Sequence, residues 1–271
     1  AALIGILRRA HVTASFFNLG SNEIADAAAV RIETRDGFAL GDHTWDHSDL
    51  SQLDAAGQAR EIDRARVAEA RISGHYTCLL RPPFGDYDAT TLRLAAERHL
   101  AVRTWSVDPE DWKAAGVATP YWVHRIVARA EAGGTQRHPV VLLHNQTGGN
   151  PATVLALPHI IRYYRSHGYR FVDLNGNTGR PTVSRLSATT GSTTGGYRLV
   201  IRGANFRRVT GVRFGVVGVP AFTIRSPGRL VVTVPSHHRG RVMITVRTAD
   251  HGDTPATAAA RFRFVKQGPG R

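Results

Sequence analysis

The sequence predicts an α/β fold with parallel strands, followed by a smaller β-sandwich. Three observations lead to this prediction. Over residues 1–176, short apolar runs alternate with segments of helical periodicity, which is typical of parallel strands joined by helical crossovers. After residue 181, apolar side chains recur at every second position between clusters of Gly, Pro and Ser. The charge changes at the same place, because residues 1–180 hold 20 Lys+Arg and 19 Asp+Glu whereas residues 181–271 hold 15 and 2.

The bulk composition excludes several classes of protein. The chain has 271 residues, of which 42% are hydrophobic, and this suits one large globular domain plus a small module. No run of 18 apolar residues occurs, so no membrane span is expected. Cys78 is the single cysteine, so no internal disulfide is possible. The chain opens at Ala1 on a helical pattern with neither Met nor a signal peptide, so we expect the native start to lie upstream.

The elements of the first part follow from local patterns. The opening residues place Leu3, Ile4 and Ile6 on one side of a helix and Arg8 and Arg9 on the other. Strands are expected where β-branched and aromatic residues form short runs that Gly, Pro or a polar residue closes. Helices are expected over 1–10, 22–35, 51–73, 90–99, 119–132 and 155–167, and strands over 12–19, 37–41, 77–80, 101–107, 140–143 and 169–174.

Polar side chains follow four successive predicted strands, at the point where each strand ends. They are His43 and His47, Arg81, Asp108 and Asp111, and His144. In a parallel barrel the carboxyl ends of the strands open on one face, where such enzymes place their active sites. Packing does not readily explain this repetition, so we expect these side chains to form one site.

The pair His43 and His47 predicts a metal site. We expect the two residues on the first turn of a helix, where positions i and i+4 share a face and two imidazoles can converge on one cation. Neutral imidazole is the commonest side-chain ligand of zinc-like metals. The spacing alone is weak evidence, because 13 His in 271 residues also produce it by chance.

The motifs HTWDH, RPPFG, DPEDW and LLH, preceded by Thr13-Ala14-Ser15-Phe16-Phe17-Asn18-Leu19-Gly20, occur in an order and at a spacing that resemble the NodB-like polysaccharide deacetylases. The resemblance covers residues 1 to about 176. It implies a distorted (β/α) barrel and a hydrolase acting on carbon–nitrogen but not peptide bonds. Such an enzyme removes N-acetyl groups from amino-sugar polysaccharides, or sometimes O-acetyl groups from xylan, with one divalent metal.

The resemblance also implies roles for single residues. His43 and His47 would be metal ligands, Arg81 would orient the catalytic base, and His144 would be the general acid that protonates the departing amine. Asp111 would pair with His144 or Arg81. The slot for the acetyl methyl group and the sugar face would be lined by Trp112, Leu142, Phe84 and the adjoining Pro83.

Structural readings of the same residues stay open. Arg81 could simply close a salt bridge. Trp112 and Phe84 could belong to the core, and His144 could be a buried histidine whose hydrogen bonds are satisfied.

The sequence departs from the family in one respect. The family's first motif, similar to TFDDG, supplies the general base and the third metal ligand, and no two Asp residues are adjacent in this chain. The first barrel strand is missing with it, so we interpret the chain as truncated. Asp42 and Asp46 are the nearest replacements for the carboxylate. Because catalytic zinc normally takes three protein ligands, we expect weak metal binding and little or no activity.

The second part resembles the IPT/TIG immunoglobulin-like modules. Strands of period two are expected over 198–203, 209–214, 222–224, 230–234, 242–248 and 261–265. The likeness is carried by the pattern PTVSRLSATTGSTTGGYRLVIRGANF, with Gly195-Gly196 and the run at residues 203–206. We expect a deacetylase domain over 1–176, a linker over 177–181 and the IPT/TIG domain over 182–266. The module is either a spacer or, since residues 181–271 hold 14 Arg, a binder of an anionic cell-wall polymer. A nucleic-acid role fits a sugar deacetylase poorly.

Two functions remain from these observations. The first is an extracellular or wall-associated deacetylase of peptidoglycan or chitin type, with zinc as the expected metal and cobalt, nickel or manganese as alternatives. The second is a non-catalytic glycan- or wall-binding protein on a decayed deacetylase scaffold.

Overall fold

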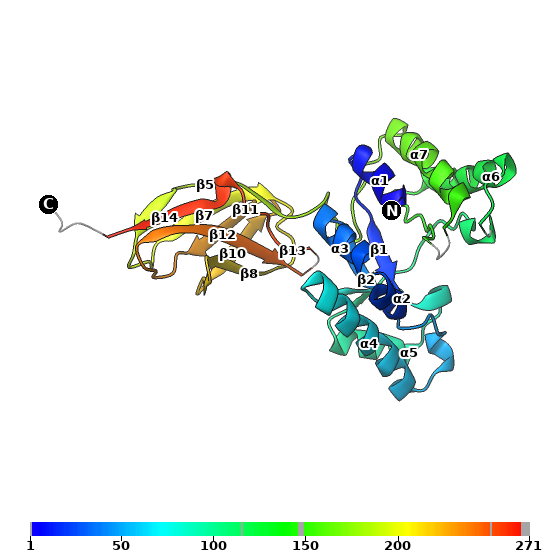
Figure 1. Ribbon diagram of the computed structural model, residues 1–271, viewed down its shortest axis with the longest axis horizontal. Helices are drawn as coiled ribbons and strands as arrows, with labels where there is room; N and C mark the ends of the chain where they lie inside the picture. The colour runs from blue at the N-terminus through cyan, green and yellow to red at the C-terminus, as the bar shows by residue number, and fades with distance from the viewer. Residues whose placement is uncertain (1, 115, 146–148, 250, 267–271) are drawn as a thin grey trace.

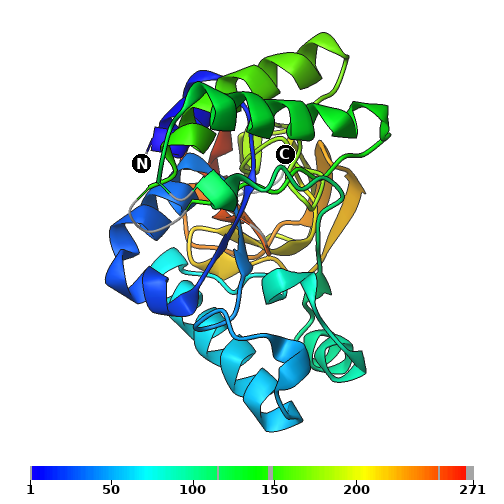
Figure 2. The same ribbon diagram turned by 90° about the vertical axis from the view of Figure 1, so that its right-hand side faces the viewer.

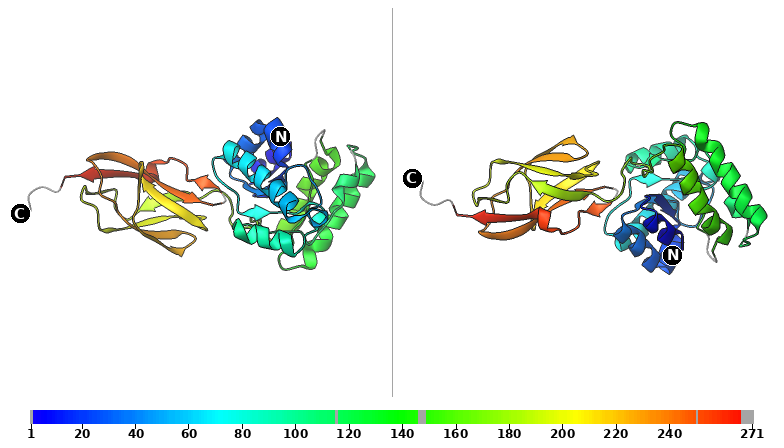
Figure 3. Two further views of the ribbon diagram at one scale, coloured as in Figure 1. Left: turned by 90° about the horizontal axis from the view of Figure 1, so that it is seen from below. Right: turned by 90° about the horizontal axis from the view of Figure 1, so that it is seen from above.

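The structure is a computed structural model that describes residues 2–114, 116–145, 149–249 and 251–266. An α/β region, which comprises elements α1 to α7, and a β-sandwich, which comprises β5 to β14, lie end to end (Figures 1 and 3). None of the described helices combines the length and the hydropathy that crossing a bilayer requires.

A parallel sheet forms the centre of the α/β region. Its strands are β1 (Ser15–Asn18), β2 (Ala39–Asp42), β3 (Leu79–Leu80) and β4 (Ala101–Val102), in that spatial order. All three pairings are parallel and join sequential strands with a helix between them, as the alternating pattern predicted. Beyond β4, one further parallel bridge joins Val107 to Val141.

The helices flank this sheet in two groups. Figures 1 and 2 show α1, α6 and α7 on one side of β1 and β2 and the pair α4 and α5 on the other. In the first group, Leu3, Ile4 and Leu7 pack against Leu157 and Ile161, so the amphipathic pattern of the opening residues is buried as predicted. The helices are α1 (Ala2–Arg9), α2 (Gly20–Ala25), α3 (Ala27–Asp36), α4 (Ala55–Ser73), α5 (Ala89–Glu97), α6 (Pro120–Glu131) and α7 (Pro151–Ser166), with short 3-10 turns η1 (Leu50–Gln52), η2 (Pro83–Gly85), η3 (Asp111–Ala114) and η4 (Ala132–Thr135).

Two expected helices are interrupted by capping aspartates. The helix expected over 22–35 divides into α2 and α3, because Asp26 accepts a hydrogen bond from the backbone N–H of Ala29 and so begins a new helix. The helix expected from residue 51 begins at α4 instead, where Asp54 accepts from the N–H of Gly57 over 2.6 Å. In both places a side chain that competes for backbone hydrogen bonds overrides the helical periodicity.

Two expected strands are not formed as strands. Residues 140–143 contribute the bridge at Val141 and the hydrogen bond from the N–H of Leu142 to the carbonyl of Val107. Residues 169–174 pair with no strand in the described part of the chain, and the N–H of Leu174 donates to Oγ of Ser15 instead. An extended segment becomes a strand only where a neighbour completes its ladder of hydrogen bonds, and apolar composition does not reveal that neighbour.

The β-sandwich consists of two sheets. One has the order β10-β11-β7-β5, and the other has the order β6-β14-β12-β8-β9, with β13 paired to β12. The core between them is dominated by Phe206, Phe214, Phe262 and Phe264, all of which are fully buried. The strands are β5 (Thr182–Leu186), β6 (Thr190–Ser192), β7 (Arg198–Ala204), β8 (Val209–Phe214), β9 (Val217–Gly218), β10 (Phe222–Ser226), β11 (Arg229–Thr233), β12 (Gly240–Thr248), β13 (Gly252–Asp253) and β14 (Arg261–Val265), with the 3-10 turn η5 (Ala258–Ala260).

All six strands expected in the sandwich are present, as β7, β8, β10, β11, β12 and β14. Four further strands, β5, β6, β9 and β13, were not predicted. Each has five residues or fewer. Of the seven residues in β6, β9 and β13, six are Gly, Thr, Ser or Asp, so period two is hard to recognise in these strands.

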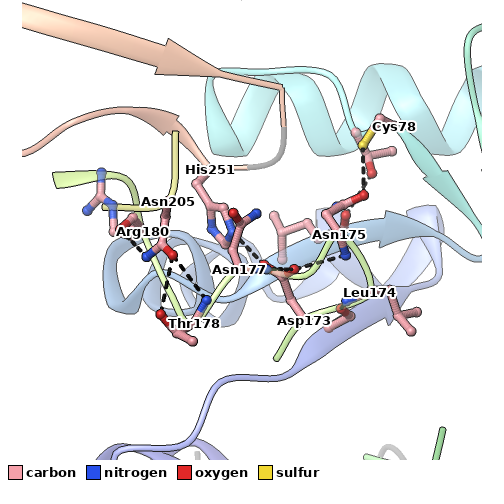
Figure 4. Close-up of polar contacts among 12 residues, drawn as sticks. Cys78, Asp173, Leu174, Asn175, Asn177, Thr178, Arg180, Asn205 and His251 are labelled. Carbon is pink, nitrogen blue, oxygen red and sulfur yellow. Dashed lines mark hydrogen bonds and ion pairs between the residues drawn. The ribbon is translucent and has the colours of Figure 1, made fainter. Parts of the chain in front are cut away.

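The segment that joins the two parts is held by both of them (Figure 4). Asp173 contacts Nε2 of His251 over 2.8 Å, and both side chains are buried. Arg180 donates from Nη1 to the carbonyl of Arg35 and from Nη2 to the carbonyl of Asp253, at 3.1 and 3.0 Å. Its side chain also fills the space beside Gly37, which has a φ of +82° and where a Cβ would clash with it. The junction is therefore packed rather than a free tether.

Candidate active site

The histidine pair lies in a loop that directly follows β2. Asp42 ends the strand, and its Oδ1 accepts a hydrogen bond from the N–H of Thr44 over 2.7 Å. The hydroxyl of Thr44 in turn accepts from the N–H of His47 over 3.2 Å. Thr44 and His47 have φ angles of +70° and +73°, which no helical turn contains. The prediction that the pair sits on the first turn of a helix is therefore wrong, because side-chain hydrogen bonds direct the backbone here.

The loop still brings the two imidazoles together. Their ring centroids are 4.9 Å apart at an interplanar angle of 80°. Nδ1 of His43 lies 2.6 Å from the carbonyl oxygen of Arg81, and because a carbonyl only accepts, Nδ1 carries the proton and Nε2 keeps its lone pair. This arrangement, with one ring nitrogen bonded to backbone and the other available, is typical of metal-ligating histidines.

Both imidazoles are held in their neutral form. Burial, with the charges of His47, Arg81 and His144 as further causes, lowers the pKa of His43 to about 4. Burial also lowers the pKa of His47, with His144 as the next cause. Neutral rings are what a metal requires, and the mutual influence of the three histidines indicates that they share one neighbourhood.

A third protein ligand does not join them among the residues that the structure describes. Asp42 is buried, its Oδ1 is used by the loop, and burial raises the pKa of its carboxyl to about 8. Asp46 lies on the surface, where it accepts hydrogen bonds from Ser48. His43 and His47 thus fit a divalent cation as two donors, and neither aspartate supplies the carboxylate that was considered as a replacement.

Arg81 is a buried cation. Its guanidinium donates from Nε to the carbonyl of Arg103 and from Nη2 to that of Thr104, at 3.2 and 3.3 Å, and it lies 4.1 Å from the ring centroid of Phe17. Burial lowers its pKa to about 10. No carboxylate of the described residues pairs with it, so the alternative of a simple salt bridge is not observed. A guanidinium held in this way is ready to accept an anionic partner.

Asp111 and His144 form the second half of the site. Asp111 is completely buried in η3, and its Oδ1 accepts from Nδ1 of His144 over 2.7 Å. Its Oδ2 accepts from the backbone N–H of the same histidine over 2.8 Å. Of the two partners expected for Asp111, it therefore contacts His144. The imidazole is one-third exposed, so His144 is not a histidine enclosed in the core.

Two further residues hold Asp111 and were not found from the sequence. The hydroxyl of Thr153 donates to Oδ2 over 2.6 Å, and Nδ2 of Asn150 donates to the backbone carbonyl of Asp111 over 3.2 Å. Asn150 also caps α7, whose first residue is Pro151. The run Asn-Pro-Ala-Thr was a recognisable helix start, and that signal could have placed both side chains at the edge of the site.

The expected lining residues differ in their surroundings. Phe84 is 60% exposed, has a φ of +61°, and its ring lies 4.7 Å from that of His47. Trp112 is 46% exposed, so neither aromatic ring belongs to the core, and that alternative is wrong. Pro83 is buried at the start of η2, and Leu142 is buried two residues before His144. Phe84 is thus the lining residue that directly contacts an imidazole of the site.

Both parts of the chain match family models. Residues 1–102 match the family model described as polysaccharide deacetylase, and residues 181–264 match the model of the IPT/TIG domain. The chain is 31% identical over 173 residues to the peptidoglycan-N-acetylglucosamine deacetylase PgdA of Listeria monocytogenes, an alignment that covers 64% of this chain and 34% of that protein. It is 30% identical over 169 residues to the peptidoglycan-N-acetylglucosamine deacetylase of Bacillus cereus, covering 62% and 59%.

Solved structures agree with these relatives. The Bc1960 peptidoglycan N-acetylglucosamine deacetylase superposes with a TM-score of 0.59 at 29% identity, over 64% of this chain and 78% of that chain. The expected fold class of the α/β region is thereby confirmed. The chain spans about a third to three-fifths of the length of the curated relatives that it matches first.

Proposed function

The N-terminal part of this chain belongs to the polysaccharide deacetylase family and is followed by an IPT/TIG domain, and on that premise we propose that it serves the removal of N-acetyl groups from amino-sugar polysaccharides. The observation that carries this proposal is the meeting of the His43–His47 pair with the Asp111–His144 pair. We propose a substrate of peptidoglycan or chitin type and a place outside the cell or at the wall. The names of the relatives PgdA and the Bacillus cereus enzyme support peptidoglycan.

Hydrolysis of an amide needs three chemical contributions: an activated water, an electrophile at the carbonyl oxygen and a proton for the departing amine. We propose that His43 and His47 hold one divalent metal, with zinc as the first candidate and cobalt, nickel or manganese as alternatives. When bound, the metal would polarise the carbonyl and lower the pKa of a water. The free Nε2 of His43 and the neutral state of both rings support this assignment.

His144 is the proposed general acid. Asp111 holds Nδ1–H of the ring, so Nε2 is the nitrogen that can carry a proton to the substrate. In its protonated form His144 gives this proton to the amine nitrogen as the carbon–nitrogen bond breaks, and acetate is the other product. The buried carboxylate of Asp111 stabilises the imidazolium of His144 before the proton is transferred.

Arg81 and the apolar residues have supporting roles in the proposal. The guanidinium of Arg81 has no carboxylate partner among the described residues, and we assign to it the orientation of the catalytic base. Phe84, beside His47, would contact the acetyl methyl group. Pro83, Trp112 and Leu142 complete the proposed lining of the slot and of the sugar site. We further propose the domain limits 1–176 and 182–266, with residues 177–181 as the linker.

The printed sequence supplies two of the three protein ligands that catalytic zinc usually takes, and it has no adjacent aspartates. We therefore expect this polypeptide alone to bind the metal weakly and to release acetate slowly or not at all. A second candidate function is a non-catalytic glycan- or wall-binding protein on a decayed deacetylase scaffold.

Acetate release from chito-oligosaccharides and peptidoglycan fragments, with zinc added, tests both candidates. We compare the 271-residue chain with the same chain extended at its N-terminus by a strand that ends in Asp-Asp. The extended chain should release acetate, and its His144→Ala variant should not. His159→Ala, an exposed residue of α7, is the matched control. The deacetylase proposal would be refuted by an extended chain that is folded and binds zinc but releases no acetate. Acetate release by the 271-residue chain at the rate of the extended chain would refute the expected impairment.

A further inference from the structure

Three arginines form a row across one sheet of the sandwich. In the register of β5, β7 and β11, Arg185 lies opposite Arg202, and Arg202 lies opposite Arg229. All three are exposed, while Leu186, Ile201 and Leu230, which follow or precede them, are buried in the core. Neighbouring strands are about 4.8 Å apart, so the three side chains leave the outer face of the sheet side by side.

The row has no anion among the described residues of its own domain to neutralise it. After residue 180 the sequence holds two acidic residues, Asp250 and Asp253, and the first lies outside the described residues. Asp253 is already engaged, because Arg213 and Arg247 of the other sheet each approach it to 2.7 Å. Like charges directly opposite one another destabilise a sheet. Repulsion within the row is therefore expected to lower the free energy of unfolding, and no carboxylate of the described residues offsets it.

Outside the row, this outer face carries one further arginine on β7 and a pair of valines. On β7 the outward positions alternate as Arg198, Val200 and Arg202, and Val200 lies opposite Val231 of β11. The four strands of the sheet contain one aromatic residue, Phe222, and its ring packs against the core. Proteins that bind single-stranded nucleic acids present aromatic rings for base stacking, so this face favours a polyanion without bases.

We propose that the outer face of the β10-β11-β7-β5 sheet binds a linear anionic wall polymer whose charges are polyol phosphodiesters. Guanidinium groups match phosphate oxygens in paired hydrogen bonds, and a row of three can follow successive phosphates. The choice of a wall polymer over other phosphodiesters rests on the proposed function, since the other domain would act on a wall glycan. Binding through the row would then hold the deacetylase at the wall that contains its proposed substrate.

Two triple variants of the full chain test this proposal. Arg185→Gln/Arg202→Gln/Arg229→Gln removes the row. Arg241→Gln/Arg261→Gln/Arg263→Gln removes the same charge from the other sheet, where Arg241 lies opposite Arg263. Binding of purified poly(glycerol phosphate) is measured over a salt series, with a DNA oligonucleotide of equal phosphate number and a neutral polyol polymer as comparison ligands.

The row variant should bind poly(glycerol phosphate) at least tenfold more weakly, and the control variant should lose less than threefold. The slope of log affinity against log salt should fall by about 2 to 3 in the row variant alone, by analogy with phosphate contacts to nucleic acids. Thermal unfolding should be unchanged or slightly higher in the row variant, because repulsion is relieved, so a loss of binding does not reflect misfolding.

Equal losses in both triple variants would overturn the proposal in favour of diffuse charge attraction. DNA binding as tight as polymer binding and lost with the same row would overturn it in favour of a nucleic-acid surface, and no binding of poly(glycerol phosphate) by the unaltered chain would overturn it outright. The readout involves no acetate release. A chain that binds through the row but never deacetylates therefore supports this inference while the proposed activity fails.

Discussion

Asp111 holds His144 at two points: Oδ1 accepts from the ring nitrogen Nδ1 over 2.7 Å, and Oδ2 accepts from the backbone N–H over 2.8 Å. One buried carboxylate thus fixes both the position of the histidine backbone and the orientation of its ring. Thr153 and Asn150 satisfy the rest of the carboxylate, so Asp111 itself has little freedom to move.

Asp111→Asn should reverse the tautomer of His144. An amide that turns its NH₂ group toward Nδ1 requires a lone pair there, which moves the proton of the neutral ring to Nε2 and removes the lone pair with which Nε2 would take up a proton. Nitrogen NMR chemical shifts of the imidazole report the tautomer directly. We also expect a loss of about 1–3 kcal/mol in the free energy of unfolding, because buried partners lose a charged acceptor. Asp108 accepts a hydrogen bond from the N–H of Glu110 and lies outside this pair, so Asp108→Asn is the control and should leave the tautomer unchanged.

Single alanine substitutions of His43 and His47 should each lower zinc affinity at least about tenfold, because two donors are all that the described residues provide. Burial lowers the pKa of His43 to about 4 and also lowers that of His47. Protons therefore compete poorly, and binding should persist below pH 6 where ordinary imidazoles are charged. Titration calorimetry between pH 7.5 and 5 measures this, with His159→Ala as the control. Equal zinc affinity in the two variants and the control would show that His43 and His47 do not bind the metal.

Glu23→Gln should make the protein more stable at alkaline pH. Burial, followed by the charges of Asp42 and Glu33, raises the pKa of Glu23 from 4.5 to about 8, and neither of its carboxylate oxygens has a hydrogen-bond partner among the described residues. The folded protein keeps this proton between pH 4.5 and 8 while the unfolded chain loses it, so stability is present below pH 4.5 and falls as the pH rises through 8.

The glutamine variant lacks that dependence. At pH 8.5 its free energy of unfolding should exceed that of the unaltered protein by about 2–4 kcal/mol, and at pH 4.5 the two should be nearly equal. Urea denaturation at the two pH values provides the comparison. Glu97→Gln, a half-exposed residue of α5, should show no such difference. A stability difference that is the same at both pH values would contradict a neutral Glu23.

His251→Ala should loosen the junction between the two parts of the molecule. The substitution leaves the Asp173 carboxylate buried beside a void, and removing one partner of a buried pair typically costs about 3–5 kcal/mol. We expect one cooperative thermal transition in the unaltered chain and two separate transitions in the variant. Arg247→Gln breaks an exposed ion pair within the sandwich and should cost less than about 1 kcal/mol. A single transition at an unchanged temperature in His251→Ala would show that the contact does not couple the two parts.

Much of the fold could be predicted from the sequence, because buried strands and amphipathic helices leave periodic patterns. The parallel pairing of β1 to β4 and six strands of the sandwich followed from such patterns. The residues 169–174 show the limit, since their apolar composition matches a strand while their hydrogen bonds go elsewhere. Strand pairing depends on two segments, whereas the composition of one segment gives no information about its partner.

The residue types of the candidate site follow from the sequence and stay a prediction, whereas the helical geometry expected for the histidine pair is wrong. His43 lies beside His47 and Asp111 contacts His144, and each pair follows the carboxyl end of a strand or bridge. The loop conformation at the histidines depends on hydrogen bonds from Asp42 and Thr44, which a 3.6-residue period does not describe. The contribution of Thr153 to Asp111 spans 42 residues, and no local pattern encodes such a contact.

The junction also has a consequence for how the molecule opens. Arg180 bonds to the carbonyl of Arg35 and fills the space beside Gly37, directly before β2, and the other end of that four-residue strand leads to His43. We therefore expect the junction, the strand and the histidine loop to open together when the backbone amides of β2 exchange with solvent. We expect them to be among the slowest hydrogens of the α/β region to exchange, with a protection that depends on residues of the sandwich.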